Sequence, residues 1–179
     1  MTITGASILA DPPVGGHIVF PYSDEVRAMD VVANYAAAGF RNGEAVVLIL
    51  TPEHCTEIDD RLSSEGFDIL ALKGSAQYQC ADAAKTLSKF MAAEIPDQNL
   101  FEATVRPIIK NAKAFGKVRA YGEMVSLLFR KNHAAALRLE EFWNDLLRTE
   151  SICLLCTYNI TGSSDLASDL CATHSHYVV

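Results

Sequence analysis

The segment of residues 117–125, Lys-Val-Arg-Ala-Tyr-Gly-Glu-Met-Val, holds the side chains best suited to chemistry. It is typical of a short strand that breaks at Gly122 and leads into a helix. Side chains alternate along a strand, so Arg119, Tyr121 and Glu123 are predicted to share one face. Open α/β sheets bind ligands at the carboxyl ends of their strands, where this face ends. Because a buried charge needs a partner, we expect Arg119 and Glu123 to pair, either across the mouth of a site or as a structural ion pair at a sheet edge.

Sulfur and imidazole groups near the C-terminus raise the question of a metal site. Cys153 and Cys156 are three residues apart, and Cys171 is followed by His174 and His176. These residue types are zinc ligands. Residues three apart on a strand point to opposite faces, so Cys153 and Cys156 cannot hold one ion and are expected to be buried, inert thiols. We therefore predict no metal, with Cys171, His174 and His176 left as a partial set.

Motifs for nucleotide chemistry and for covalent catalysis are absent from the sequence. A phosphate-binding loop needs a Gly-rich turn followed by Lys and then Ser or Thr. The first predicted strand is followed instead by Pro21-Tyr-Ser-Asp24. A dinucleotide fingerprint is absent from that turn, and no Gly-x-Ser-x-Gly elbow occurs. We therefore predict a non-catalytic protein that uses no cofactor.

The composition indicates one globular domain. The chain has 179 residues, of which 50% are hydrophobic and 21% charged, as in an ordinary soluble domain. A net charge of -7 argues against nucleic acid as a direct partner, and no apolar run reaches the roughly 18 residues that span a membrane. The N-terminus lacks the basic start of a secretory signal, and five cysteines, an odd number, suit reduced thiols. We therefore expect a cytoplasmic protein.

Strands and helices alternate along the chain and would position these residues. This alternation predicts an α/β fold of three layers, with a mostly parallel sheet between helices on both faces. Gly39 suits the end of the first helix, and 74–80 is expected to be a loop. Residues 1–15 are expected to be a flexible arm, and residues 16–179 a single domain. The expected strands are 17–20, 44–50, 67–72, 117–122, 151–158 and 176–179, and the expected helices are 24–38, 52–66, 82–91, 98–115, 123–131, 134–147 and 165–172.

Short pieces along nearly the whole chain match one known family. They are His17 with Tyr22, Gly43-Glu44, Arg119 to Met124, Ala136 to Trp143, Leu154 to Tyr158, and Cys171 with His174. In this order they resemble the MEDS domain, the methanogen/methylotroph sensory domain named after a dichloromethane-responsive regulator. That family looks like a degenerate relative of the RecA/KaiC-like ATPases, so the resemblance implies a RecA-like core without the phosphate-binding loop. It also implies prokaryotic signal transduction, as in two-component systems, through sensing of small hydrocarbon derivatives.

A ligand-binding cleft is our main functional expectation for a chain of this kind. We place it at the carboxyl ends of the strands, where Arg119 would anchor an anionic or polar head group and Glu123 would accept a hydrogen bond. Aromatic rings would cover an apolar body. The signal would pass to a separate partner, a kinase or a transcription regulator, because the chain leaves no room for an attached output segment. The expected lining residues are His17, Tyr22, Arg119, Glu123, Tyr158 and His174.

Two other functions stay open on the sequence. One is an enzyme that uses Glu123 as general base and a histidine as acid. The other is a protein-interaction module that regulates a histidine kinase or an anti-sigma-type switch through an exposed helix such as 134–147. A homodimer is compatible with each of these functions.

Overall fold

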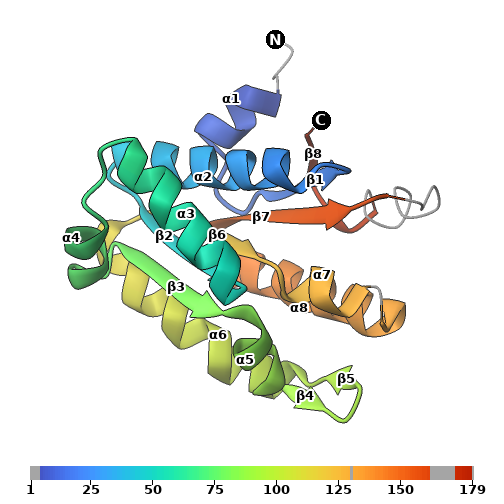
Figure 1. The fold of residues 1–179 in the computed structure, drawn as a ribbon. Coiled ribbons are helices and arrows are strands. Elements are labelled where there is room, and N and C mark those ends of the chain that lie inside the picture. Colours follow the sequence, from blue (N-terminus) through green and yellow to red (C-terminus); the bar gives the residue numbers. More distant parts are fainter. Residues whose placement is uncertain (1–4, 130, 162–171, 179) are drawn as a thin grey trace.

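A computed structural model of the chain describes residues 5–129, 131–161 and 172–178. Its centre is a six-stranded sheet with the order β3-β2-β6-β7-β1-β8, in which neighbouring strands run parallel. Helices cover both faces of the sheet (Figure 1), so the predicted three-layer α/β fold is confirmed. The strands are β1 (His17–Tyr22), β2 (Ala45–Leu50), β3 (Tyr78–Asp82), β6 (Val118–Gly122), β7 (Ile152–Asn159) and β8 (His176–Tyr177).

The helices divide into two layers, one on each face of the sheet. One layer packs α1 (Gly5–Ala10), α2 (Glu25–Arg41), α3 (Pro52–Ser64) and α4 (Ile69–Gly74) against the sheet. The other layer contains α5 (Ala83–Ser88), α6 (Gln98–Ala112), α7 (Met124–Phe129) and α8 (His133–Thr149). A 3-10 turn (Lys113–Phe115) follows α6, and a small hairpin of β4 (Met91–Ala92) and β5 (Ile95–Pro96) precedes it. Among the described residues, none of the helices has the length and apolar character that crossing a bilayer requires.

Side-chain caps begin the helices where the sequence predicted them. At the start of α2, Asp24 accepts a hydrogen bond from the backbone N–H of Val26. Thr51 does the same for the N–H of His54 at the start of α3, with Pro52 at the first helical position. Such a cap satisfies a backbone donor and contributes about 1 kcal/mol. Two of the helices that surround the sites described below are therefore fixed at their N-termini by local sequence.

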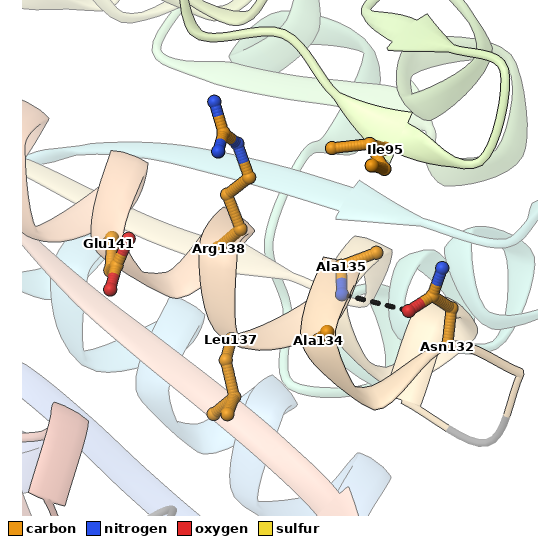
Figure 2. A pocket seen from close by; sticks show the side chains of 7 residues that line it. All are labelled: Ile95, Asn132, Ala134, Ala135, Leu137, Arg138 and Glu141. Carbon is orange, nitrogen blue, oxygen red and sulfur yellow. Dashed lines mark hydrogen bonds between the residues drawn. The ribbon is translucent and has the colours of Figure 1, made fainter.

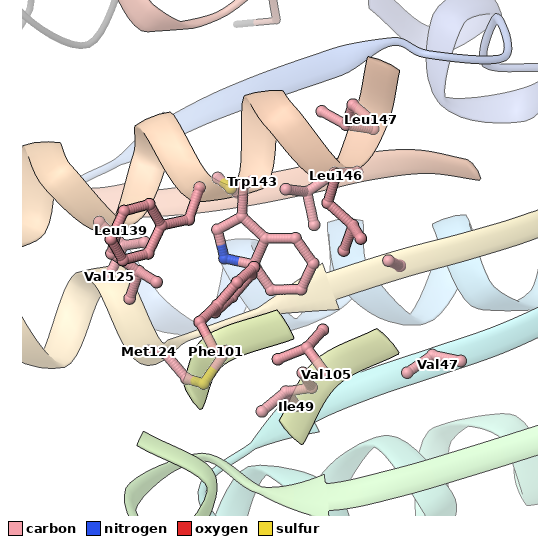
Figure 3. Close-up of a cluster of buried hydrophobic side chains, with 14 of the residues drawn as sticks. Val47, Ile49, Phe101, Val105, Met124, Val125, Leu139, Trp143, Leu146 and Leu147 are labelled. Atoms are coloured by element: carbon pink, nitrogen blue, oxygen red, sulfur yellow. The ribbon is translucent and has the colours of Figure 1, made fainter. Parts of the chain in front are cut away.

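The layer formed by α6 and α8 holds the larger aromatic cluster. Trp143 is 1% exposed, and its ring meets that of Phe101 edge to face, with centroids 5.2 Å apart. Figure 3 shows both rings between the helices and the sheet, above Val47 and Ile49 of β2. Edge-to-face aromatic pairs add about 0.5–1.5 kcal/mol to the burial of their area. This packing holds α8 firmly against the sheet.

The third strand lies further along the chain than the sequence predicted. Residues 67–72 were expected to be a strand, but Ile69–Gly74 form helix α4. The Asp68 side chain caps this helix by accepting from the N–H of Ala71. The strand β3 occupies Tyr78–Asp82 instead, in the segment expected to be a loop. This strand is at the sheet edge and is mostly half-buried, so its sequence lacks the apolar run of a central strand.

The cysteines differ in part from the expected reduced thiols. Cys55 in α3 and Cys80 in β3 form a disulfide, with Cα atoms 6.7 Å apart. The two elements meet because α3 packs back over β2, and β3 pairs with β2. Cys153 and Cys156 are free and buried on opposite faces of β7, as the strand period predicted. Cys171 lies outside the described residues.

Regular secondary structure lies near both ends of the chain. Residues 1–15 were expected to be a flexible arm, but Gly5–Ala10 form α1, which packs on α2. The C-terminal edge strand was predicted correctly, since β8 pairs with β1. The helix expected at 165–172 lies outside the described residues except for its last position.

Candidate functional site

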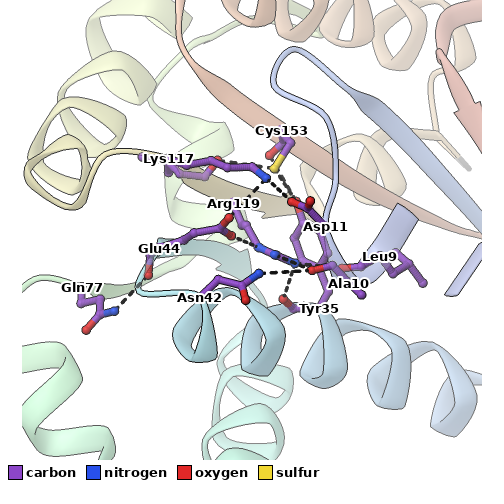
Figure 4. A network of polar contacts seen from close by, with 11 residues as sticks. Leu9, Ala10, Asp11, Tyr35, Asn42, Glu44, Gln77, Lys117, Arg119 and Cys153 are labelled. Atoms are coloured by element: carbon purple, nitrogen blue, oxygen red, sulfur yellow. Dashed lines mark hydrogen bonds and ion pairs between the residues drawn. The ribbon is translucent and has the colours of Figure 1, made fainter. Parts of the chain in front are cut away.

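Arg119 lies near the start of β6, within a buried polar network (Figure 4). Its side chain is 0% exposed, and its Nε donates to the carboxylate of Glu44. The two terminal nitrogens donate to the backbone carbonyls of Leu9 and Ala10, each at 2.8 Å. The guanidinium carbon also lies 5.2 Å from the centroid of the Tyr35 ring. The charge is therefore neutralised and its donors are used within the protein.

This position corrects two expectations. Arg119 and Glu123 do not pair, because Arg119 lies near the amino end of β6 whereas Glu123 follows its carboxyl end. Arg119 also cannot anchor a ligand head group without breaking the contacts that attach α1 to the sheet. The predicted alternation is nevertheless confirmed, since Tyr121 also packs on the α2 face and Val118 on the other.

Glu123 lies at the carboxyl end of the sheet and contacts the start of α3. Its Oε2 accepts from the backbone N–H of Thr51 at 2.8 Å, and its Oε1 is 2.5 Å from Nδ1 of His54. The Tyr121 hydroxyl donates to Oε1 at 3.4 Å and is 2.8 Å from Oγ1 of Thr157. Glu123 is therefore a preorganised acceptor whose position is set by the start of α3 and by Tyr121 of β6.

His54 extends this arrangement toward solvent. Its side chain is 21% exposed, and Nε2 lies 3.4 Å from Oε1 of Glu25 at the start of α2. Two carboxylates thus flank one imidazole, so a ligand that approaches His54 would meet hydrogen-bond acceptors on both sides of the ring. Burial, with the nearby Glu123 carboxylate, raises the pKa of Tyr121 well above its ordinary value. Tyr121 therefore stays a neutral hydrogen-bond donor beneath the pair.

A second group of polar residues is buried between the sheet and α8. His17 of β1, Cys156 of β7 and Glu140 of α8 are each exposed by 2% or less. The side chain of His174, from the C-terminal segment, is 1% exposed. Nε2 of His17 is 3.1 Å from Oε2 of Glu140 and 3.5 Å from Sγ of Cys156, while Nε2 of His174 is 3.6 Å from Oε1 of Glu140. The Tyr158 hydroxyl donates to this carboxylate.

Further contacts orient the two imidazoles of this buried group. Nδ1 of His17 lies 2.9 Å from Oδ1 of Asn144, and Nδ1 of His174 lies 2.9 Å from Oγ1 of Thr173. Burial, with the charge of Glu140, raises the pKa of the Cys156 thiol well above its ordinary value. The group therefore joins a thiol, a carboxylate and two imidazoles in a space that excludes water.

The predicted lining residues do not form one cleft. His17, Tyr158 and His174 lie together in the buried group, whereas Glu123 belongs to the pair with His54 and Arg119 is at the opposite end of β6. Tyr22 is the last residue of β1 and therefore lies, like Glu123, at the carboxyl ends of the strands. His176, a residual metal candidate, lies in β8 with its Nδ1 2.8 Å from Oγ of Ser175.

Sequence reasoning missed the two residues that organise these groups. Glu140 occupies the apolar stripe of α8, one position after Leu139 and three before Trp143, and is 1% exposed. A carboxylate on the buried stripe of an amphipathic helix is the signal that could have identified it. His54 gave no comparable signal, because its partner Glu123 is distant in sequence.

A shallow groove of about 420 Å³ lies between the β4–β5 hairpin and the first turns of α8 (Figure 2). Ile95 of the hairpin is 55% exposed and faces this helix. Arg138 crosses the groove and donates to the backbone carbonyl of Pro96. Leu137 is only partly exposed, and the outer face of α8 is otherwise mostly polar. This surface gives little apolar area for a partner helix.

Comparison with known proteins tests the resemblance. A family model described as the methanogen/methylotroph, DcmR sensory domain, abbreviated MEDS, matches residues 16–175. The matched range includes both polar groups described above, and it confirms the resemblance seen in the sequence. The relation to RecA/KaiC-like ATPases stays a prediction. No curated protein matches the chain.

Proposed function

Since the chain belongs to the MEDS family of sensory domains, we propose that it binds a small organic molecule at the carboxyl ends of its strands. We further propose that it passes the binding signal to a separate signalling protein. Family membership assigns a sensory role. The ligand, its position and the partner, a kinase or a transcription regulator, are our proposal.

The observation that supports this position most is the pair formed by His54 and Glu123. Glu123 is 6% exposed and held by the N–H of Thr51, while His54 reaches solvent from the same edge. Open α/β sheets bind ligands at the carboxyl ends of their parallel strands, where preorganised polar groups fix the ligand. A ligand that contacts His54 would thus affect α3, β6 and, through Glu25, α2.

The charges at this edge define the class of ligand. Arg119 is not available to bind an anion, and Glu25 and Glu123 both approach His54. An anionic ligand would be repelled, whereas an alcohol or an amine could donate a hydrogen bond to a carboxylate. We therefore propose a neutral or cationic molecule with at least one donor group.

The test is a thermal-shift and calorimetric titration of the whole chain with methanol, methylamine and acetate. We expect methylamine or methanol, but not acetate, to raise Tm. At a hundredfold excess over Kd the stabilisation is about 2.7 kcal/mol, or about 5–10 °C for a domain of this size. His54→Ala and Glu123→Gln should weaken binding about 10–100-fold, the effect of losing a hydrogen bond to a charged group.

Glu53→Gln is the matched control, because it removes an exposed carboxylate from the first turn of the same helix. Equal loss of binding in Glu53→Gln and Glu123→Gln would contradict the proposed site, and so would tighter binding of acetate than of methylamine.

The short contact between His54 and Glu123 is also compatible with an enzyme that uses Glu123 as general base. Turnover of a bound compound that is lost in Glu123→Gln would favour catalysis over sensing.

A further inference from the structure

We propose that His17, Glu140, Cys156 and His174 bind one Zn²⁺ ion between the sheet and α8. Each residue offers one ligand atom, and these atoms all lie within 4.8 Å of one another. The sequence pointed toward Cys171, His174 and His176, and only His174 belongs to the group found in the structure. This inference is independent of the proposed ligand at His54 and Glu123.

The separations between the donor atoms suit a tetrahedral ion. The contacts from His17 to Glu140 and to Cys156 are 3.1 and 3.5 Å, and that from His174 to Glu140 is 3.6 Å. Zinc takes nitrogen and oxygen ligands at about 2.0–2.2 Å and sulfur at about 2.3 Å, so tetrahedral neighbours are separated by about 3.3–3.7 Å. The donor atoms as a set lie within 4.8 Å of one another, so the more distant ligands would move inward by about 1 Å to hold the ion.

Hydrogen bonds outside the group direct ring nitrogens toward this centre. The Asn144 amide donates through Nδ2 to the carbonyl of Thr173 at 3.0 Å, which leaves its Oδ1 to face Nδ1 of His17. Nδ1 of His17 must then donate, so Nε2 keeps its lone pair, 3.5 Å from Sγ of Cys156 and 3.1 Å from Oε2 of Glu140. Zinc-binding histidines are held in the same way by a hydrogen bond from their other nitrogen.

The charge balance also favours a cation. Glu140 is 1% exposed, and within the described chain its ion-pair partners are His17 and His174, with no Lys or Arg. Without an ion, Oε2 of Glu140 accepts no hydrogen bond of acceptable geometry from the described residues, although Nε2 of His17 lies 3.1 Å away. A metal ion would satisfy this oxygen and account for a thiol placed beside it.

The donor set identifies the class of metal. One sulfur, two imidazoles and one carboxylate suit Zn²⁺, whereas Mg²⁺ and Ca²⁺ prefer oxygen ligands alone. Four buried protein ligands leave no open position, as in structural sites. The ion would join β1, β7, α8 and the C-terminal segment, which come from both ends of the chain.

The test is metal binding by the whole chain after chelation and dialysis. We expect one equivalent of Zn²⁺ by elemental analysis, and one equivalent of Co²⁺ with a sulfur-to-cobalt charge-transfer band. Cys156→Ser should lose that band and Cys153→Ser should keep it, because Cys153 is buried on the opposite face of the same strand. His174→Gln should weaken Co²⁺ binding, whereas His176→Gln should not.

Asn144→Ala is a milder variant, for use if Cys156→Ser fails to fold. It keeps all four ligands but removes the hydrogen bond that orients His17, so Zn²⁺ affinity should fall about 10–100-fold. The proposal is overturned if the folded wild-type chain takes up neither Co²⁺ nor Zn²⁺. It is equally overturned if the cobalt band survives in Cys156→Ser or if His176→Gln and His174→Gln weaken binding alike.

Discussion

Glu150 is a buried carboxylate that follows α8 and lies between two cations. Its side chain is 6% exposed, and its two oxygens contact Lys113 and Arg106. Lys113, followed by Arg106, lowers the pKa of Glu150 below its ordinary value of 4.5. The carboxylate thus connects α6 and the turn after it to the end of α8.

We expect Glu150→Gln to lower the free energy of unfolding at pH 7 by about 1–3 kcal/mol, the effect of losing hydrogen bonds to charged groups. A carboxylate with a depressed folded-state pKa stabilises above its unfolded pKa, and this contribution is lost as pH falls through the folded value. The difference between wild type and variant should therefore be constant above about pH 5.5 and shrink below pH 4.5. Urea unfolding between pH 3 and pH 7 measures it.

Glu102→Gln is the control for this pH dependence. Glu102 pairs with the same Arg106 one helical turn away, but its side chain is 42% exposed. Such an exposed pair contributes about 0.3–0.5 kcal/mol. A similar loss in both variants, or a difference for Glu150→Gln that grows on acidification, would contradict the role given to Glu150.

Single residues show where sequence reasoning works and where it stops. The period of a strand was enough to place Arg119 and Tyr121 on one face and to separate Cys153 from Cys156. It could not identify Glu44 as the partner of Arg119, because this depends on how β2 and β6 align. Glu44 precedes β2, and Val46, two residues further along, is paired with Arg119 in the sheet register. Partners set by tertiary register are not encoded in any local pattern.

At the scale of the element, α2 shows a glycine whose role differs from the one expected. Gly39 was expected to end the helix, but α2 continues to Arg41 and the turn is made by Gly43, at φ +73°. A Cβ at position 39 would lie 2.8 Å from Cδ of Arg119 and 3.0 Å from a methyl group of Val46. Gly39 is therefore needed for the close approach of α2 to β6 and β2.

Gly39→Ala should destabilise the protein although alanine favours helices. Arg119 cannot move aside easily, because Glu44 and the carbonyls of α1 hold its guanidinium. Overpacking costs about 1–3 kcal/mol, and the gain in helix propensity of about 1 kcal/mol offsets part of it. We expect a net loss of up to about 2 kcal/mol in urea unfolding.

Gly74→Ala provides the matched control, since a Cβ there meets no atom within 4 Å. It should be neutral or slightly stabilising. A stabilising effect of Gly39→Ala would mean that α2 and the sheet are less closely packed than described. Elements with strong apolar patterns, such as α2 and β2, were predictable. The helix α4 was missed although Asp68 caps it, because the apolar run at 67–72 suggested a strand, and β3 was missed because a half-buried edge strand carries a weak pattern.

At the scale of the whole molecule, the two hydrophobic layers share one sheet. Val47 of β2 and Leu154 of β7 belong to the α6–α8 layer, while Val46 and Leu155 belong to the α2–α3 layer. Each central strand therefore contributes alternate residues to both layers. Neither layer can lose its packing without exposing one face of the same strands, so the two should unfold together.

Trp143 makes this coupling measurable, because it is the only tryptophan and lies in the α6–α8 layer. Val32 is 0% exposed in α2, in the other layer, and Val105 is 0% exposed in α6. Val32→Ala and Val105→Ala each remove the two buried γ-methyl groups and leave a cavity. This lowers the free energy of unfolding by about 2–3 kcal/mol. In each variant, we expect Trp143 fluorescence and far-UV circular dichroism to report the same shift of the urea midpoint.

The double variant distinguishes one cooperative unit from two. The sites lie in different layers without shared partners, so their losses should add to within about 0.5 kcal/mol and act on a single transition. Independent layers would behave differently: Val32→Ala would lower the circular dichroism transition and leave the Trp143 transition in place. The sheet joins both layers through its buried strands. Glu123 lies at the carboxyl ends of these strands, and His17 and Cys156 lie on the sheet face that packs on α8. A single transition would therefore mean that a ligand at either position stabilises the whole chain, whereas separate transitions would restrict each effect to its own layer.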